Sequence, residues 1–273
     1  MKSTKTVILA AGHGTRMVSE KPKVLHEVGG KAMLNYVISA SEAAGADDIA
    51  VIVGYKADIV KAALPENLTA IEQKEQLGTG HAVLQALPFF ENFNGNVLVL
   101  VGDAPLVRKE TLEELVKAHE DGGFSATVLT AVFDDPTGYG RIVKKGDELI
   151  KIVEHKDATE EERNIKEINS GMYCFDAQAL KAALQAINSD NVQGEYYLTD
   201  TIEILRGMGK KVGSYPTPDV DDIAAVNSKV QLAEIGKIMR RRINTSLMEA
   251  GAIIIDPENT YLSAETKVGK DTV

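Results

Sequence analysis

Small and charged residues near the N-terminus have the composition of an anion-binding loop. An apolar, β-branched run at residues 7–11 is followed by residues 12–16, which contain two glycines, a threonine and Arg16, and Lys23 comes shortly afterwards. Glycines allow the backbone to take positive φ angles and to approach a ligand closely, and exposed N–H groups favour an anion. Arg16 can donate parallel hydrogen bonds to a phosphate, and Lys23 adds a compact second cation. The pattern predicts a buried parallel strand that runs into a phosphate-binding loop.

Two better-known phosphate-binding loops do not fit this segment. The dinucleotide fingerprint G-x-G-x-x-G would need a third glycine where Met17 stands, and no part of the chain provides G-x-x-x-x-G-K-[ST]. A tight strand-to-loop turn without a ligand is the simplest alternative for a pair of glycines. The closeness of Arg16 and Lys23 favours a phosphate site over that alternative.

Asp103 and Asn227 are candidate metal ligands. Asp103 follows the apolar run 97–101, so its carboxylate is expected just past a buried strand. Mg²⁺ is usually held by one or two protein oxygens together with substrate phosphates. Asp103 close to Pro105 also suits a turn or a helix cap, and Asn227 taken alone suits the N-cap of a long helix. The residues by themselves leave these alternatives open.

Composition and charge exclude several classes of protein. The 273 residues are 44% hydrophobic and carry a formal net charge of −10, with a pI near 5.1. An acidic chain is unsuited to general nucleic-acid binding, which needs a basic surface. The single cysteine, Cys174, excludes an internal disulfide and a multi-cysteine zinc site, and its apolar neighbours predict a buried, inert thiol. No apolar run reaches the length of a membrane span, and no signal peptide is recognisable. A cytoplasmic enzyme without nucleic-acid or membrane partners is therefore expected.

Alternating strands and helices must position these residues. Apolar runs predict strands, and helical periodicity predicts helices, in alternation: strands at 49–53, 69–73 and 97–101, and helices at 33–44, 58–64, 80–87 and 109–119. This alternation indicates an α/β fold with a doubly wound, mostly parallel sheet. In such sheets ligands bind outside the carboxyl ends of the strands, which is where the glycine loop and Asp103 follow their strands.

The pattern changes after residue 135. Short strands at 138–143 and 149–153 indicate a β-rich insertion, followed by helices at 177–187 and 197–205 and a strand at 212–215. A long helix is predicted over 226–248, with a solvated Arg240-Arg241-Arg242 run and a buried side formed by Val230, Ile235, Ile238, Met239 and Leu247. Residues 253–257 and 268–273 resemble the first coils of a left-handed hexapeptide β-helix, whose core needs neighbouring coils.

The glycine loop also carries a family resemblance. Leu9-Ala10-Ala11-Gly12-x-Gly14-Thr15-Arg16-Met17, followed by Pro22-Lys23, resembles the signature of the sugar-1-phosphate nucleotidyltransferases. Within that superfamily, later motifs are similar, in order, to those of the bacterial bifunctional enzymes that join an N-acetylglucosamine-1-phosphate uridyltransferase domain to a glucosamine-1-phosphate acetyltransferase domain. The resemblance implies a Rossmann-like uridyltransferase domain at 1–226, a linker helix at 227–250 and the truncated start of the left-handed β-helix at 251–273.

The resemblance also implies roles for individual residues. Arg16 and Lys23 would be catalytic, and Asp103 and Asn227 would hold Mg²⁺. Lys23, Asp103 and Asn227 would also bind substrate. The other substrate-binding residues would be Leu9, Ala10, Ala11 and Gly12 in the loop, Gln73, Gly78 and Thr79 around uracil, Val101 and Gly102 beside Asp103, and Gly140, Glu154 and Asn169 around the sugar. Taken alone, most of these would be ordinary loop residues, and Thr79 would suit a helix cap.

The implied reaction is the attack of N-acetylglucosamine 1-phosphate on UTP, which gives UDP-N-acetylglucosamine and pyrophosphate for peptidoglycan and lipopolysaccharide precursors. The attacking phosphate is already an anion, so positioning and charge neutralisation should suffice. A homotrimer would form through a complete β-helix, and no complete acetyltransferase site is expected in these residues. The alternatives are another sugar-1-phosphate nucleotidyltransferase using UTP or dTTP with a hexose 1-phosphate, a dinucleotide-dependent oxidoreductase, and a non-catalytic scaffold.

Overall fold

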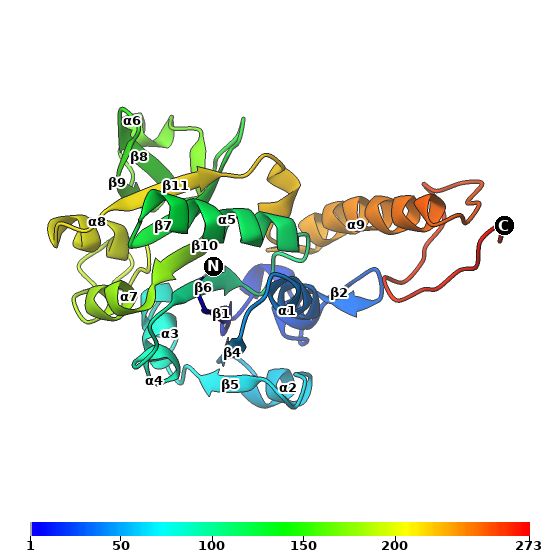
Figure 1. Cartoon of the computed structure of the whole chain (residues 1–273), viewed down its shortest axis with the longest axis horizontal. Helices are drawn as coiled ribbons and strands as arrows, with labels where there is room; N and C mark the ends of the chain where they lie inside the picture. The colour runs from blue at the N-terminus through cyan, green and yellow to red at the C-terminus, as the bar shows by residue number, and fades with distance from the viewer. Residues whose placement is uncertain (1) are drawn as a thin grey trace.

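A mixed sheet of nine strands forms the centre of the molecule. The computed structural model describes residues 2–273, and its strand order is β11-β7-β10-β6-β1-β4-β5, with the hairpin β8–β9 joined to β10 (Figure 1). The strands are β1 (Thr4–Ala10), β4 (Asp48–Val53), β5 (Thr69–Glu72), β6 (Asn96–Val101), β7 (Ala126–Val132), β8 (Arg141–Lys145), β9 (Glu148–Val153), β10 (Glu167–Asp176) and β11 (Val212–Pro216). A separate two-stranded sheet contains β2 (Glu27–Val28) and β3 (Lys31–Ala32).

Helices cover both faces of the large sheet. They are α1 (Met33–Ala43), α2 (Ala57–Ala62), α3 (Thr79–Gln85), α4 (Leu87–Phe90), α5 (Lys109–Gly122), α6 (Glu160–Arg163), α7 (Ala177–Leu184), α8 (Asp200–Gly207) and α9 (Lys229–Glu249). Three short 3₁₀ turns also occur: η1 (Thr15–Met17), η2 (Lys23–Leu25) and η3 (Val220–Ile223). The alternation along the chain gives the α/β architecture that the sequence predicts.

The central strand β1 is buried on both faces. It pairs in parallel with β4 and with β6, so Ile8 lies opposite Val51 on one side and Leu100 on the other. Side chains of a strand alternate between faces: Val7 packs in the cluster under α3, α7 and α8, and Ile8 packs in the cluster under α1 and α5. Two-sided burial explains why these strands read as continuous apolar runs.

Strand β10 departs from the parallel pattern. It runs antiparallel between β6 and β7, and the β8–β9 hairpin continues from it, so the residues of the expected β-rich insertion are joined to the main sheet. Strand β7 was not predicted from the sequence. The helix expected at 80–87 is two short helices, with Pro88 at the start of the second, and the helix expected at 197–205 begins at Asp200.

Helix α9 extends away from the sheet (Figure 1). Ile235 and Met239 pack in a small apolar cluster against Met17 and Leu106, as the predicted buried side requires. Val230 is 72% exposed, so its predicted burial is wrong. Val230 precedes Ile235 by five residues, which turns its side chain about 140° around the helix axis, away from the side that packs on the domain.

The C-terminal segment 250–273 contains no assigned helix or strand. Its two apolar stretches lie side by side, because the Ile253 N–H donates to Thr272 O at 2.8 Å and the Asp271 N–H donates to Gly251 O at 2.8 Å. The Ala264 N–H donates to Gly29 O at 2.9 Å, which joins this segment to the turn between β2 and β3. The start of a β-helix in this segment stays a prediction, as do the bounds of the three predicted regions.

A buried histidine should make folding sensitive to acid. His119, on α5, is 2% exposed and lies 3.0 Å from Thr127 Oγ1, and burial lowers its pKa to about 4. The unfolded chain takes up this proton near pH 6.5, so stability is full above that pH and falls as the pH drops towards 4.

Between pH 7 and pH 5 we expect a loss of about 2 kcal/mol from this group, measured by urea unfolding at both pH values. His119→Gln cannot titrate and should show a correspondingly smaller loss over the same interval. An equal pH dependence in the two proteins would contradict the assignment.

Candidate active site at the carboxyl ends of the central strands

Two adjoining cavities open where the central strands end. They share the wall formed by Leu9, Thr79 and Val101, and their volumes are about 350 Å³ and 340 Å³. Cavity A is lined in addition by Ala10, Ala11, Gly12, His13, Lys23, Val24, Gln73, Gln76, Gly78, Ala82, Asp103 and Glu195. Cavity B is lined in addition by Gly138, Tyr139, Gly140, Glu154, Asn169, Ser170, Gly171, Tyr173, Leu198, Thr199 and Asn227.

The glycine loop brings Lys23 into cavity A. Gly14 has φ +61°, and a Cβ at that position would lie 2.7 Å from Lys23 Cβ, closer than side chains approach one another. Only glycine combines this backbone angle with this close approach. The buried Met17 then anchors η1 in the apolar cluster beneath α9. The second glycine of the motif is therefore needed to place the lysine.

Lys23, Asp103 and Asn227 meet at the boundary between the cavities. The Lys23 ammonium donates to Asp103 Oδ2 and, at 3.2 Å, to Asn227 Oδ1. The Val226 N–H donates to Asp103 O at 2.9 Å, so the backbone of the two loops is also joined. Neither side chain caps a helix: Arg108 precedes α5, and Ser228 caps α9 by accepting from the Gln231 N–H. The helix-cap alternative is therefore not supported for either side chain, whereas Asp103 does lie in a turn, from which its carboxylate binds Lys23.

This cluster has the donor set of a hard divalent cation. A carboxylate oxygen and an amide oxygen already converge on one positive charge, the lysine ammonium. Within residues 2–273 no group of three or more His, Cys, Asp or Glu side chains is arranged to hold a metal. Asp103 and Asn227 could thus supply only part of a coordination shell, and phosphate oxygens or water would complete it, as is usual for Mg²⁺.

Gln73 is held rigidly at the other end of cavity A. Its side chain is 3% exposed, and Nε2 donates to Gly78 O at 3.1 Å and lies 3.0 Å from His81 Nδ1. Because the Gly78 carbonyl oxygen can only accept, the Gln73 amide must direct its Nε2 towards that oxygen. Gln73 Oε1 has no hydrogen-bond partner in the described part of the chain and remains available as an acceptor.

Backbone contacts hold the segment around Gly78 in place. Gly78 has φ +109°, and a Cβ there would lie 2.5 Å from Tyr196 O, so no other residue fits. The Tyr196 N–H donates to Leu77 O at 2.8 Å, and the Leu198 N–H donates to Thr79 Oγ1 at 3.0 Å. Thr79 therefore binds a neighbouring segment and does not cap α3. The floor of cavity A is fixed before any ligand arrives.

A β-bulge places Asn169 in cavity B. The register between β10 and β7 shifts between Asn169 and Tyr173, and Gly171, at φ +80°, lies inside this irregularity. Bulges re-aim side chains beside functional sites. Asn169 Oδ1 accepts from the Gly171 N–H at 3.0 Å, and the Asn169 N–H donates to Gly140 O at 2.9 Å.

Acidic groups surround the far wall of cavity B. Burial raises the pKa of Glu154, and the negative charges of Asp157, Asp200 and Glu195 act in the same direction. The Thr199 hydroxyl donates to Glu154 Oε1 at 3.3 Å and partly offsets this effect. Burial and nearby acids also raise the pKa of Asp200 to about 6. This wall suits a neutral, hydroxyl-rich ligand better than an anion.

Two of the sequence-predicted site residues do not line either cavity. Gly102 is buried and donates its N–H to Leu9 O at 2.9 Å, and a Cβ added there would lie 3.2 Å from Leu34 Cδ1 and 3.3 Å from Val24 Cγ1. Arg16 is exposed and has no ion pair or hydrogen bond among residues 2–273. Its positive charge opposes the rise that burial causes in the pKa of Tyr139, a residue that lines cavity B. All the other predicted site residues line cavity A or cavity B.

Some lining residues were not predicted from the sequence. Gln76 and Glu195 line cavity A, and Tyr173 and Leu198 line cavity B. Gln76 donates to Gln73 O at 2.9 Å, and its place in the same segment was an available signal. Tyr173 had no such signal, because it lies in an apolar strand that reads as core.

Among the described residues, no helix combines the length and the apolar character that a membrane crossing requires.

The fold and the two cavities together define a nucleotidyltransferase-type α/β domain. Residues 6–195 match the family of the MobA-like NTP transferase domain, and the chain belongs to this family. It is 50% identical over its whole length to the "Bifunctional protein GlmU" of Caldanaerobacter subterraneus subsp. tengcongensis and 49% identical over 271 residues to that of Clostridioides difficile. The chain spans about 60% of the length of these relatives.

A solved structure supports the fold. A Bacillus anthracis protein described as a glucose-1-phosphate thymidylyltransferase, crystallised in complex with a sucrose, superposes with a TM-score of 0.70. The match covers 86% of this chain and 95% of the other at 19% sequence identity, so it confirms the α/β architecture predicted from the sequence.

The position of the Lys23 ammonium predicts competition with a divalent cation. Lys23→Met keeps the length of the side chain but removes the charge between Asp103 and Asn227. Mn²⁺, titrated without nucleotide and followed by electron paramagnetic resonance, should bind about tenfold more tightly, because removing a nearby like charge is worth about 1.4 kcal/mol or more at this range.

Lys21→Met is the matched control, because Lys21 pairs with Glu27 on the exposed surface. Unchanged or weaker Mn²⁺ binding in Lys23→Met would show that Lys23 and the cation do not share these oxygens.

Proposed function

We propose that this chain transfers a uridylyl group from UTP to N-acetylglucosamine 1-phosphate, forming UDP-N-acetylglucosamine and pyrophosphate. The observation that carries the proposal is the place of the Lys23–Asp103–Asn227 cluster. Lys23 and Asp103 line cavity A, Asn227 lines cavity B, and the two cavities share one wall. Phosphates from two ligands, one in each cavity, would meet at this cluster. The similarity to bifunctional GlmU proteins supports the choice of nucleotide and sugar.

In this proposal the nucleotide occupies cavity A. Uracil carries an N3–H donor between two carbonyl acceptors, and the free Gln73 Oε1 can accept from that donor. Backbone groups at Gly78 and Thr79 can serve a carbonyl. Cytosine presents an acceptor at N3, which would face Gln73 Oε1 and leave both without a partner. A buried polar group left unpaired gives strong discrimination between ligands.

The sugar phosphate occupies cavity B. The Glu154 carboxylate can accept from ring hydroxyls. Burial and the nearby acids disfavour its negative charge, and these hydroxyl donors would stabilise it. Asn169 can donate its amide N–H to the carbonyl of an N-acetyl group, since its Oδ1 is held by Gly171. Gly140 lines the same cavity, and its backbone N–H can bind the sugar.

The reaction needs no general base. An oxygen of the sugar phosphate forms a bond to the α-phosphorus of UTP, while the bond from that phosphorus to the bridging oxygen breaks and its electrons leave with pyrophosphate. Mg²⁺ held by Asp103 and Asn227 would supply charge neutralisation for the phosphates. Lys23, released from these two oxygens, reaches the phosphates as a second cation, and exposed Arg16 is free to bind the leaving group. Positioning and electrostatics carry such transfers.

Broader roles follow from the same proposal. The product would serve peptidoglycan and lipopolysaccharide precursor synthesis in the cytoplasm, and the longer protein would form a homotrimer through its β-helix. These statements stay predictions.

The rival proposal is a different sugar-1-phosphate nucleotidyltransferase, with dTTP or a hexose 1-phosphate as substrate. The Bacillus anthracis protein described as a glucose-1-phosphate thymidylyltransferase shares this fold, so this rival is kept as the second candidate. Family membership gives no support to the oxidoreductase and scaffold alternatives.

A pyrophosphate-release assay tests the proposal. UTP, dTTP and CTP should be combined with N-acetylglucosamine 1-phosphate or glucose 1-phosphate, with and without Mg²⁺. We expect the highest kcat/KM for UTP with N-acetylglucosamine 1-phosphate and Mg²⁺. Arg16→Ala, Lys23→Ala and Asp103→Ala should each lower kcat by on the order of 10²–10³, because each removes a preorganised charge contact. A preference for dTTP or glucose 1-phosphate would favour the rival, and near-normal kcat in Asp103→Ala would contradict its metal role.

Gly140→Ala should affect the sugar phosphate alone. The added Cβ would lie 3.3 Å from Ile152 Cγ2 and 3.6 Å from Glu154 Oε2, and φ at this position is not positive, so the fold tolerates it. The methyl group narrows cavity B, and KM for the sugar phosphate should rise about tenfold, equivalent to about 1.4 kcal/mol, while KM for UTP stays unchanged.

Gly207→Ala, where a Cβ would meet nothing within 4 Å, is the matched control and should leave both KM values unchanged. A larger rise in KM for UTP than for the sugar phosphate would place the sugar elsewhere.

A further inference from the structure

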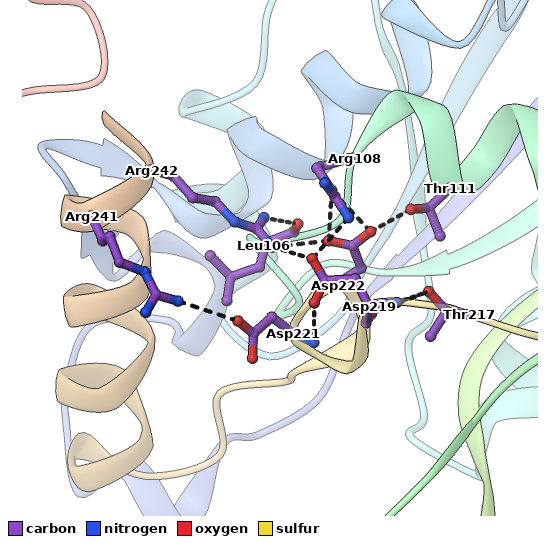
Figure 2. Close-up of polar contacts among 9 residues, drawn as sticks. All are labelled: Leu106, Arg108, Thr111, Thr217, Asp219, Asp221, Asp222, Arg241 and Arg242. Atoms are coloured by element: carbon purple, nitrogen blue, oxygen red, sulfur yellow. Dashed lines mark hydrogen bonds and ion pairs between the residues drawn. The ribbon is translucent and has the colours of Figure 1, made fainter. Parts of the chain in front are cut away.

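A buried carboxylate lies in the segment that leads to Asn227 without lining either cavity. Asp222, in η3, is 0% exposed and accepts from Arg108 Nε at 2.9 Å and 3.1 Å and from Arg242 Nη2 at 3.0 Å (Figure 2). The Thr111 hydroxyl also donates to it. Its partners come from the start of α5 and from α9, so one side chain joins η3 to two helices that are distant from each other in the sequence.

The same arginines also bind neighbouring groups. Arg242 Nη1 donates to Leu106 O at 2.6 Å, and Arg108 Nη2 donates to Asp219 Oδ2 at 2.8 Å (Figure 2). Arg242 therefore holds the backbone of the loop after β6 with one nitrogen and the carboxylate of Asp222 with another. We call Arg108, Asp219, Asp222 and Arg242 the clamp.

The clamp acts on both candidate metal ligands. Leu106 belongs to the loop that carries Asp103, and Asp222 begins the segment that ends at Asn227. Between them, the Val226 N–H donates to Asp103 O at 2.9 Å, and Val226 is fully buried in the cluster that contains Leu106. The clamp thus closes a ring of contacts that fixes one ligand loop relative to the other.

The far side of Asn227 is fixed by α9 itself. The Asn227 N–H donates to Gln231 Oε1 at 2.8 Å, and Ser228 caps the helix. Arg242 lies further along the same helix. Helix α9 therefore contacts the Asn227 segment through Gln231 in its first turn and the Asp103 loop through Arg242. A rotation or shift of α9 would change the separation of Asp103 and Asn227.

The arginine run expected on a solvated face is therefore only partly solvated. Arg241 is 68% exposed, as expected, but Arg242 is 27% exposed and bound in the clamp, and Arg240 stacks on Tyr261 at 4.6 Å. Burying charged pairs is a weak route to stability, whereas several directional, charge-assisted hydrogen bonds fix geometry. The contacts favour a positioning role.

We propose that Asp222 is a positioning residue that sets the affinity of the Asp103–Asn227 pair for a divalent cation by holding the two ligand loops in register through Arg108 and Arg242. The inference rests on the metal role assigned to this pair in the proposed function. Asp222 itself touches neither the cation nor a substrate.

Asp222→Asn tests the clamp, because it keeps the shape of the side chain and removes the charge that both arginines bind. The probe is Mn²⁺ alone, titrated into the whole chain and followed by electron paramagnetic resonance. We expect the Kd for Mn²⁺ to rise about tenfold. Asp221→Asn is the matched control, one residue away, because Asp221 faces only Arg241 at 3.9 Å; its Kd should equal that of the wild type.

A second control separates positioning from general loss of stability. Leu115→Ala removes buried core volume from α5 without touching the clamp, and it should lower Tm without changing the Kd for Mn²⁺. If Asp222→Asn does not fold, Arg242→Met replaces it, because Arg242 is partly exposed and its loss opens only the α9 side of the clamp.

Each outcome decides the question. A folded Asp222→Asn or Arg242→Met with wild-type Mn²⁺ affinity, an equal effect in Leu115→Ala, or a wild type that does not bind Mn²⁺ would overturn the inference. A wild type that binds Mn²⁺ but releases no pyrophosphate would overturn the proposed function and leave the clamp to be judged by the Mn²⁺ affinities.

Discussion

The structure depends on the meeting of one ammonium group with two oxygens. Lys23, Asp103 and Asn227 come from the N-terminal loop, the loop after β6 and the segment before α9, so no local structure could hold them together. An ammonium and a carboxylate taken out of bulk water need mutual contact and further hydrogen bonds to offset desolvation. The fold provides this by ending parallel strands at one edge and by tying the loops through backbone contacts. The divalent cation of the proposed function would have to displace the Lys23 ammonium from both oxygens.

The antiparallel strand β10 explains why there are two cavities. A purely parallel sheet would end its strands along one edge and offer one crevice. Here β10 is inserted beside β6, and at its bulge between Asn169 and Tyr173 a Cβ added to Gly171 would lie 3.2 Å from Cγ1 of Val101, the last residue of β6. The wall shared by the cavities therefore consists of residues from β1, β6 and the start of α3, and a second binding region begins directly behind it.

Much of the fold and of the site followed from local sequence signals. Strands β1, β4 and β6 are continuous apolar runs because they are buried on both faces, and α1 and α5 show helical spacing because one side of each packs on the sheet. Strand β7 was missed because residues 126–132 mix threonine with apolar residues, and its pairing with β10 and β11 is set by segments much later in the chain. Loop residues such as Lys23 and Gln73 were identified through a motif, whereas Tyr173 carries no mark of its position beside cavity B.

The arginine run on α9 shows where sequence reasoning ends. Three consecutive arginines on a helix point in three directions, so their sequence alone favours water as the common partner. Arg242 binds Asp222 instead, because η3 lies beside that one side of α9. Whether a surface charge is solvated or clamped is thus a property of packing between distant segments. The same packing decides whether Asp103 and Asn227 can act together, so the chemistry assigned to the N-terminal loop depends on a helix more than 200 residues away in the sequence.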